Sequence, residues 1–159
     1  MKYKAIIFDL DGTILFLENL RYTANTEGVL VDSFLAFHAK AKELNLKMAI
    51  ATNASTQITQ HATNVVGLDS LFAHHIYTAS LVAKGKPSPD IYLHAAAQLN
   101  VAPEECIVIE DSHNGLRAAR DAGMFCIGIN TGKQLEQLML AHLKIDHYDE
   151  IDLEKLLSK

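Results

Sequence analysis

Long apolar stretches and runs of basic residues are both missing from this 159-residue sequence. The first apolar stretch covers only residues 5–8, which is too short for the core of a signal peptide, and no later one approaches the roughly eighteen residues that span a membrane. The 14 Lys and Arg are scattered and the formal net charge is -5, so neither nucleic acid nor an anionic membrane is an expected partner. We therefore expect a soluble, cytoplasmic protein.

Cysteine is also scarce. The two cysteines, Cys106 and Cys126, both lie in short apolar stretches, where a free cysteine behaves as a small core hydrophobe. We expect two free thiols and no disulfide.

What the sequence does contain is typical of one folded domain. Its 17.5 kDa suits a single hydrophobic core, and hydrophobic residues make up 49% against 21% charged, which is too apolar for a disordered chain. We expect residues 1–159 to form a single domain.

Short apolar stretches alternate with helix-like segments, which is the pattern of an α/β protein with a mainly parallel sheet. The expected strands, about five in all, are 5–8, 48–51, 75–77, 106–109 and 125–129. The expected helices are 31–44, 90–100, 115–122, about 133–142 and 152–158. Because the strands read as continuous apolar stretches, helices should cover both faces of the sheet.

Asn45 and Gly123 are expected to end the first and third of these helices, and Ser88 to cap the second in front of Pro89.

Polar residues directly follow several of the expected strands, where open parallel sheets bind their ligands. The positions are Asp9, Asp11 and Thr13 after the first strand, Thr52 and Asn53 after the second, Glu110, Asp111 and Ser112 after the fourth, and Lys86 between the third and fourth. Two carboxylates about 4 Å apart repel each other by roughly 4 kcal/mol, and four carboxylates at one edge form several such pairs, so a cation is needed. Mg²⁺ suits an all-oxygen site and Lys86 suits phosphate, and together they indicate phosphoryl transfer.

These same residues carry a resemblance to a known family. Asp9-x-Asp11-Gly-Thr13, Thr52-Asn53, Lys86-Pro87 and Glu110-Asp111-Ser112 resemble, in order and position, the four motifs of the haloacid dehalogenase-like phosphohydrolases. The surrounding residues resemble most the branch that contains phosphoglycolate phosphatase and β-phosphoglucomutase. The resemblance implies a Rossmann-like three-layer sandwich and a Mg²⁺-dependent phosphatase.

The resemblance also implies a role for each residue. Asp9 is the expected nucleophile, forming an aspartyl-phosphate while its other oxygen binds Mg²⁺, and Asp11 is the expected general acid and base, with its backbone carbonyl on the metal. Thr52, Asn53 and Lys86 are expected to hold the phosphoryl oxygens. Asp111 is an expected metal ligand, with Glu110 beside it acting directly or through water.

Each of these positions also has a plainer interpretation. Thr52 or Asn53 could cap a helix, the Glu110-Asp111 pair could cap the next helix, and Lys86 could be an ordinary surface lysine, as Lys84 is expected to be.

The sequence departs from this branch in one respect. Relatives insert a helical cap of several dozen residues before the second motif, whereas here Asp9 and Thr52 are only 43 positions apart. Only residues 15–29 remain for a flap, so no cap domain is expected. Apolar side chains in this insert, Phe16, Leu17, Leu20 and Tyr22, either pack on the core edge or form a substrate lip or a contact in a homo-oligomer.

Three functions follow in order of preference. The first is a phosphatase acting on phosphate monoesters, small or large. The second is a phosphomutase, which needs a closing cap to keep water from its intermediate. The third is a capless core that binds phosphate or metal with little or no turnover.

Overall fold

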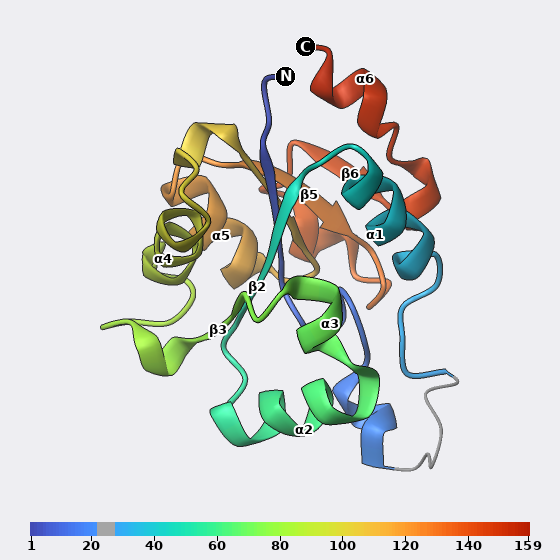
Figure 1. The fold of residues 1–159 in the computed structure, drawn as a ribbon, viewed down its shortest axis with the longest axis vertical. Helices are drawn as coiled ribbons and strands as arrows, with labels where there is room; N and C mark the ends of the chain where they lie inside the picture. The colour runs from blue at the N-terminus through green and yellow to red at the C-terminus, as the bar shows by residue number, and fades with distance from the viewer. Residues whose placement is uncertain (22–27) are drawn as a thin grey trace.

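The computed structural model describes residues 1–21 and 28–159, and every structural statement below concerns these residues. They form one six-stranded sheet, in the order β3-β2-β1-β4-β5-β6, in which every neighbouring pair is parallel (Figure 1). The strands are β1 Ala5–Phe8, β2 Lys47–Thr52, β3 Ile76–Thr78, β4 Cys106–Glu110, β5 Phe125–Ile129 and β6 Leu143–Ile145.

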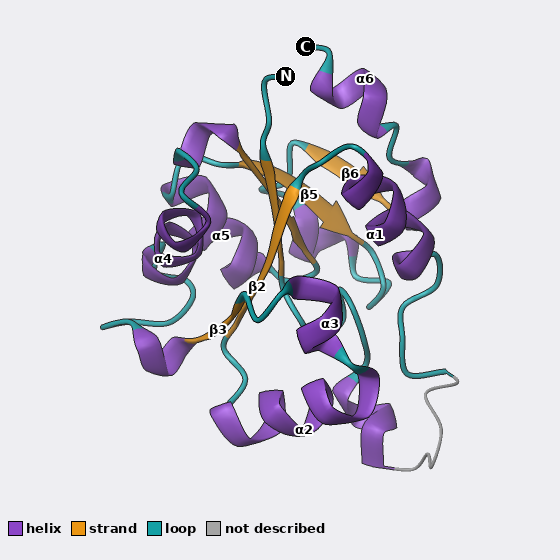
Figure 2. Cartoon of the chain, viewed as in Figure 1, coloured by secondary structure: helices purple, strands orange, loops and turns teal. Residues whose placement is uncertain are grey.

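Helices cover both faces of this sheet, as Figure 2 shows. The α-helices are α1 Phe34–Glu43, α2 Thr56–Val66, α3 Leu68–Phe72, α4 Asp90–Leu99, α5 His113–Asp121 and α6 Leu153–Leu157. Short 3-10 helices are η1 Leu17–Arg21, η2 Ala79–Leu81, η3 Pro103–Glu105, η4 Leu135–Leu138 and η5 Tyr148–Glu150. The predicted three-layer α/β sandwich is therefore confirmed.

The sheet separates two apolar cores because successive side chains of a strand point to opposite faces. On β1, Ile6 and Phe8 join the core under α1, α3 and α6, whereas Ala5 and Ile7 join the core under α4 and α5. Five rings pack together in the first core: Phe8, Phe34, Phe37, Phe72 and Tyr148. The second core uses smaller side chains, and eight of its nineteen buried residues are alanines.

The five predicted strands are confirmed with ends shifted by at most one residue. The helix predicted over 133–142 is wrong, because this stretch holds only η4 and is followed by β6, a sixth strand. Lys133 has a positive φ of 54°, which interrupts a regular helix. β6 escaped prediction because it is a three-residue edge strand with Leu143 and Lys144 exposed.

The predicted helix ends differ in outcome. Asn45 and Gly123 follow α1 and α5 with positive φ, as a helix stop requires. Ser88 does not cap α4, because that helix begins at Asp90 after Pro89 and has no side-chain cap. The helix α2 was not predicted, because its buried side chains are Thr59, Ala62 and Thr63, which give no apolar periodicity in the sequence.

The described apolar side chains of the insert between the first motif and α1 pack against the core. Leu15 and Leu20 are buried, and Phe16 and Leu17 are partly buried against the core under α1. The amide of Phe16 donates to the carbonyl of Val29, which ties the two ends of the insert together. Positions 22–27, which include Tyr22, lie outside the described residues.

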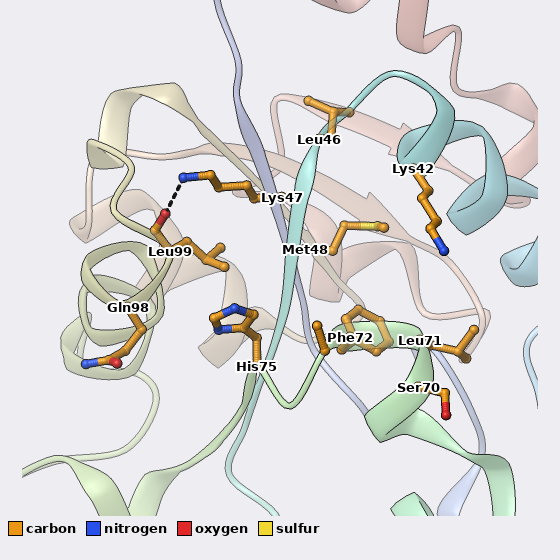
Figure 3. Close-up of a pocket in the computed structure, with 11 residues that line it drawn as sticks. Lys42, Leu46, Lys47, Met48, Ser70, Leu71, Phe72, His75, Gln98 and Leu99 are labelled. Carbon is orange, nitrogen blue, oxygen red and sulfur yellow. Dashed lines mark hydrogen bonds between the residues drawn. The ribbon is translucent and has the colours of Figure 1, made fainter.

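Both termini lie at the amino-terminal edge of the sheet, where the amide of Lys2 donates to the carbonyl of Leu157 (Figure 1). A cavity of about 500 Å³ opens at this same edge, around the start of β2 and the end of α4 (Figure 3). Among the described residues, no helix combines the length and the apolar character needed to cross a bilayer.

Candidate active site

The carboxyl ends of β1, β2 and β4 meet at the opposite edge of the sheet. Asp9 directly follows β1, Thr52 ends β2 and Glu110 ends β4, while the loop before α4 brings in Lys86. A cavity of about 500 Å³ lies here, lined by Asp9, Asn53, Lys86, Glu110, Ser112, His113, Asn114 and Gln137. Residues far apart in the sequence therefore meet where parallel sheets bind ligands.

Lys86 lies at the centre of this group. Its Nζ donates to Asp9 Oδ1 at 2.8 Å, to Glu110 Oε1 at 2.7 Å and to the carbonyl oxygen of Ala51 at 2.8 Å. Burial alone would lower the pKa of Lys86, but the charges of Asp9 and Glu110 raise it above its usual value, so the ammonium stays charged. The alternative of an ordinary surface lysine is wrong for Lys86, whereas Lys84 is exposed as expected.

Glu110 is fully buried and surrounded by donors. Its Oε1 accepts from Lys86 and from the hydroxyl of Tyr92 at 2.8 Å. Its Oε2 accepts from the amide of Asp111 at 3.0 Å and from the amide and hydroxyl of Ser112 at 3.2 and 3.1 Å. A buried carboxylate is stable only with partners of this kind.

Two glycines make room for the acidic groups. A Cβ on Gly115 in α5 would lie 1.7 Å from Glu110 Oε1, and a Cβ on Gly12 would lie 2.1 Å from Asp111 Oδ2. Gly12 also has a φ of 78°, which side chains disfavour. Each of these glycines therefore allows a carboxylate to approach the backbone.

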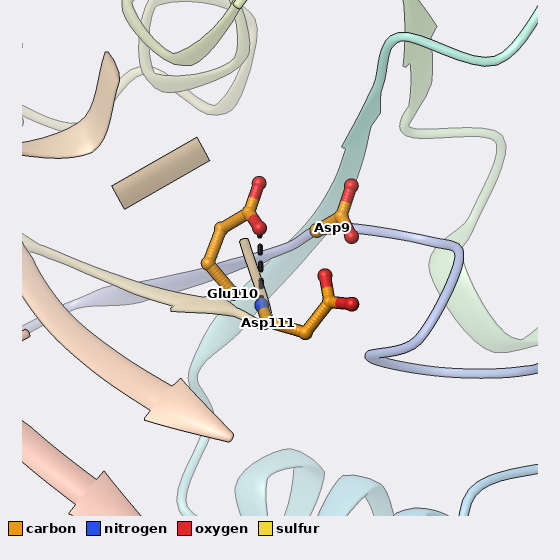
Figure 4. Close-up of side chains that lie close together, drawn as sticks. All are labelled: Asp9, Glu110 and Asp111. Carbon is orange, nitrogen blue, oxygen red and sulfur yellow. Dashed lines mark hydrogen bonds between the residues drawn. The ribbon is translucent and has the colours of Figure 1, made fainter. Parts of the chain in front are cut away.

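Three carboxylates, from Asp9, Glu110 and Asp111, form a cluster with one oxygen of each within 4.8 Å of the others (Figure 4). Burial, and then the charge of Asp9, raises the pKa of Glu110 and raises the pKa of Asp111 to about 9. One ammonium, on Lys86, faces these three carboxylates. An all-oxygen cluster with this excess of negative charge could bind a divalent cation.

Thr13 links two of these carboxylates. Its hydroxyl lies 3.2 Å from Asp9 Oδ2 and 3.5 Å from Asp111 Oδ1, and its own carbonyl accepts from the buried hydroxyl of Tyr148. The two oxygens of Asp9 therefore have different surroundings, with Lys86 at Oδ1 and Thr13 at Oδ2.

Asp11 is held apart from the cluster. Its side chain is exposed, and its Oδ1 accepts from the amide of Leu17 at the start of η1, 3.0 Å away. The structure thus brings Asp9, Lys86, Glu110 and Asp111 together and points Asp11 toward the insert. The role of Asp11 as acid and base stays a prediction.

The end of β2 places Asn53 at the cavity, directly after Thr52. Thr52 is buried and its hydroxyl accepts from the amide of Ala54, while Asn53 makes a two-way contact with the backbone of Lys86, at 3.0 Å in each direction. Neither residue caps α2, since Ser55 accepts the capping bond, so that alternative is wrong. Asn53 fixes the loop that carries Lys86.

Sequence reasoning did not assign roles to Tyr92 and Ser112. Ser112 caps α5 by accepting from the amide of Gly115, so the cap is not supplied by Glu110 or Asp111. Ser112 adjoins the acidic motif and could have been found as a capping residue. Tyr92 had no signal, because only the packing of α4 on the sheet brings it to Glu110.

Comparisons with known proteins agree with this geometry. Residues 16–123, more than half of the chain, match the family of haloacid dehalogenase-like hydrolases. The chain is 41% identical to beta-phosphoglucomutase of Bacillus subtilis over 83 residues, which are 52% of this chain and 35% of that one. It is 32% identical to phosphoglycolate phosphatase of Colwellia psychrerythraea over 122 residues, 77% of this chain and 54% of that one.

The fold has a close match among solved structures. A HAD hydrolase of family IA, variant 3, from Entamoeba histolytica superposes with a TM-score of 0.82 at 23% identity, covering 98% of each chain. The chain spans only 35% and 54% of the lengths of the two curated relatives named above. From the motifs, the fold and the family match together, the chain belongs to the haloacid dehalogenase-like hydrolases, in the branch with β-phosphoglucomutase and phosphoglycolate phosphatase relatives.

Proposed function

We propose that this protein is a Mg²⁺-dependent phosphatase that hydrolyses phosphate monoesters through an aspartyl-phosphate at Asp9. The observation that carries the proposal is the buried Asp9 carboxylate, with Lys86 at one oxygen and Thr13, next to Asp111, at the other. The similarity to phosphoglycolate phosphatase of Colwellia psychrerythraea supports it. The uncatalysed hydrolysis of phosphate monoesters is among the slowest known reactions. A nucleophile that the protein holds in the correct position lowers this activation barrier.

Asp9 attacks phosphorus in line, and the bond from phosphorus to the alcohol oxygen breaks as the new bond to Asp9 forms. Asp11 protonates the leaving oxygen, then accepts a proton from the water that cleaves the aspartyl-phosphate and restores Asp9. For this, the Asp11 carboxyl has to exchange its contact with the Leu17 amide for one with the substrate.

Lys86 offsets the charge of Asp9 and lies where negative charge gathers in the transition state. Each of its three ammonium protons already has a protein acceptor. To contact a phosphoryl oxygen, Lys86 therefore has to share one of these protons between the protein acceptor and the phosphoryl oxygen. Thr52 and Asn53 lie at the end of β2, and in this proposal they bind the oxygens of the phosphoryl group.

Asp9 and Asp111 are the carboxylates that would hold Mg²⁺, together with the main-chain carbonyl of Asp11, and Glu110 lies beside them. When bound, the ion supplies positive charge to the phosphoryl oxygens and lowers the repulsion that the nucleophile meets. The excess of negative charge in the cluster supports this assignment.

We further propose that the protein works as a single domain without a cap, with a short insert over residues 15–29 in the place of the cap. An open site favours hydrolysis over a mutase reaction, because water reaches the intermediate. The similarity to beta-phosphoglucomutase keeps a phosphomutase as the second candidate.

The test is release of phosphate from an aryl phosphate, with and without Mg²⁺, by the wild type, Asp9→Asn and Asp11→Asn. We expect metal-dependent release that both substitutions abolish. A wild type no faster than Asp9→Asn, while still binding Mg²⁺, would contradict the proposal and leave a binding core. Transfer of phosphate to a sugar phosphate, in preference to water, would instead indicate the mutase.

A further inference from the structure

Tyr92 touches both members of the ion pair beneath the nucleophile. Its side chain is fully buried on α4, and its hydroxyl donates to Glu110 Oε1 at 2.8 Å. The Lys86 Nζ lies 4.8 Å from the centre of its ring, within the range of a cation–π contact. A tyrosine has only two side-chain torsions, so once buried it is a rigid support.

Both carboxylate oxygens of Glu110 already accept hydrogen bonds, which leaves no lone pair for a metal ion. A carboxylate offers about four lone-pair sites, and five donors already surround this one: Lys86 Nζ, the Tyr92 hydroxyl, the amides of Asp111 and Ser112, and the Ser112 hydroxyl. Asp111 differs, because the hydroxyl of Thr13 is the one side-chain donor recorded within 3.5 Å of its carboxylate in the described chain. The two acidic residues of the motif therefore have different surroundings.

The ammonium of Lys86 needs such support. A lysine side chain is long and flexible, and only one of its three acceptors here, Asp9, belongs to the reacting groups. The other two, the Ala51 carbonyl and Glu110 Oε1, fix the direction of Nζ. The Ala51 carbonyl is held by the sheet, whereas Glu110 is a side chain that is itself held by Tyr92 and Ser112.

We propose that Tyr92 is a positioning residue that, through Glu110, holds the Lys86 ammonium against Asp9, and that Glu110 serves this purpose and not metal binding. The proposal rests on the proposed phosphatase function for its kinetic consequence, but the contacts themselves can be measured without turnover.

The kinetic test compares Tyr92→Phe with Tyr77→Phe. Both remove one hydroxyl from a tyrosine and keep the ring; that of Tyr77 lies 2.7 Å from His75 Nδ1, outside the site. We expect Tyr92→Phe to lower kcat about tenfold, as for loss of a hydrogen bond to a charged group, with KM changed less than about twofold. Tyr77→Phe should keep the wild-type kcat. A folded Tyr92→Phe enzyme with wild-type kcat would overturn the proposal.

The second test needs no activity. The ammonium of a buried lysine with three acceptors exchanges its protons slowly, so the ¹⁵Nζ–H signal of Lys86 should be visible in the wild type and in Tyr77→Phe. We expect Tyr92→Phe to broaden this signal or shift it. An unchanged signal in Tyr92→Phe would overturn the proposal, even if the wild type proved inactive and the phosphatase assignment failed.

The third test separates Glu110 from Asp111 by Mg²⁺ titration, followed through the unfolding temperature. We expect Asp111→Asn to weaken Mg²⁺ binding at least about tenfold more than Glu110→Gln does. Equal losses would make Glu110 a ligand and overturn that part of the proposal. If Glu110→Gln fails to fold, Tyr92→Phe decides, since it should leave Mg²⁺ affinity within about twofold of the wild type.

Discussion

Two cavities of nearly the same size lie at opposite edges of the sheet, at about 500 Å³ each. The first, at the carboxyl ends of the strands, is lined by buried Asp9, Lys86 and Glu110. The second, at the amino-terminal edge, is lined by apolar side chains such as Leu46 and Met48, with its charged groups at the rim (Figure 3). Volume alone therefore does not distinguish a site, but buried charge does.

Two lysines, one at each edge of the sheet, illustrate this difference in buried charge. Lys86 is buried and contacts two carboxylates, whereas Lys47 at the other edge is exposed and its Nζ donates to the carbonyl of Leu99. The edges differ because motif residues follow β1, β2 and β4 at the same end of a parallel sheet. At that end the loops and helix N-termini can gather polar groups around one point.

The largest expected effect comes from exchanging each lysine for Met. Lys86→Met leaves the carboxylates of Asp9 and Glu110 buried without their cation, and should lower the free energy of unfolding by about 3–5 kcal/mol. Lys47→Met should cost about 1 kcal/mol, the value of one ordinary hydrogen bond. Urea unfolding measures both. Equal losses would mean that the two edges do not differ in the way described.

Mg²⁺ should stabilise the charged edge. At a concentration of 100 times Kd, the gain in unfolding free energy is about 2.7 kcal/mol, and Asp111→Asn should lose most of it. The pKa of Asp111 is about 9 in the metal-free protein, so below pH 9 the ion has to displace a proton. Affinity should therefore rise with pH, by up to about tenfold per unit between pH 6 and 8. A Kd independent of pH would contradict this.

Two glycine substitutions test the packing around Glu110. Gly115→Ala places a methyl group on the Glu110 carboxylate, and should lower stability by about 1–3 kcal/mol although alanine favours helices. The matched change Gly132→Ala meets no atom within 4 Å and should stay within about 0.5 kcal/mol of the wild type. Thermal unfolding of both variants provides the comparison. A neutral Gly115→Ala would show that Glu110 has room to move.

The smallest effect concerns groups inside the sheet, away from both cavities. Burial raises the pKa of Cys106 and of Cys126 to about 12, so at pH 8 only about one thiol in 10⁴ is ionised. We expect no reaction with a disulfide reagent at pH 8 until the protein unfolds, when both thiols react. Fast labelling of the folded protein would show that the sheet opens near β4 or β5.

Particular elements and residues show which parts of the fold and of the site could be predicted from the sequence. Strands β1 to β5 were readable because each of them contains a short apolar stretch. The helix α2 and the strand β6 were not, since threonines form the buried face of α2 and β6 is a short, exposed edge strand. Asp9, Lys86, Glu110 and Asp111 were expected at one edge and lie there, whereas Asp11 points toward the insert.

Sequence alone identified which carboxylates and which lysine lie at the strand ends, because short motifs and apolar stretches are local properties of the chain. Tertiary structure alone decided that Tyr92 contacts Glu110, that Thr13 links Asp9 to Asp111, and that Gly115 gives the Glu110 carboxylate room. Most of these contacts join separate elements of the chain, as Thr13 and Asp111 do. The contact between Thr13 and Asp111 forms because the sheet places β1 beside β4.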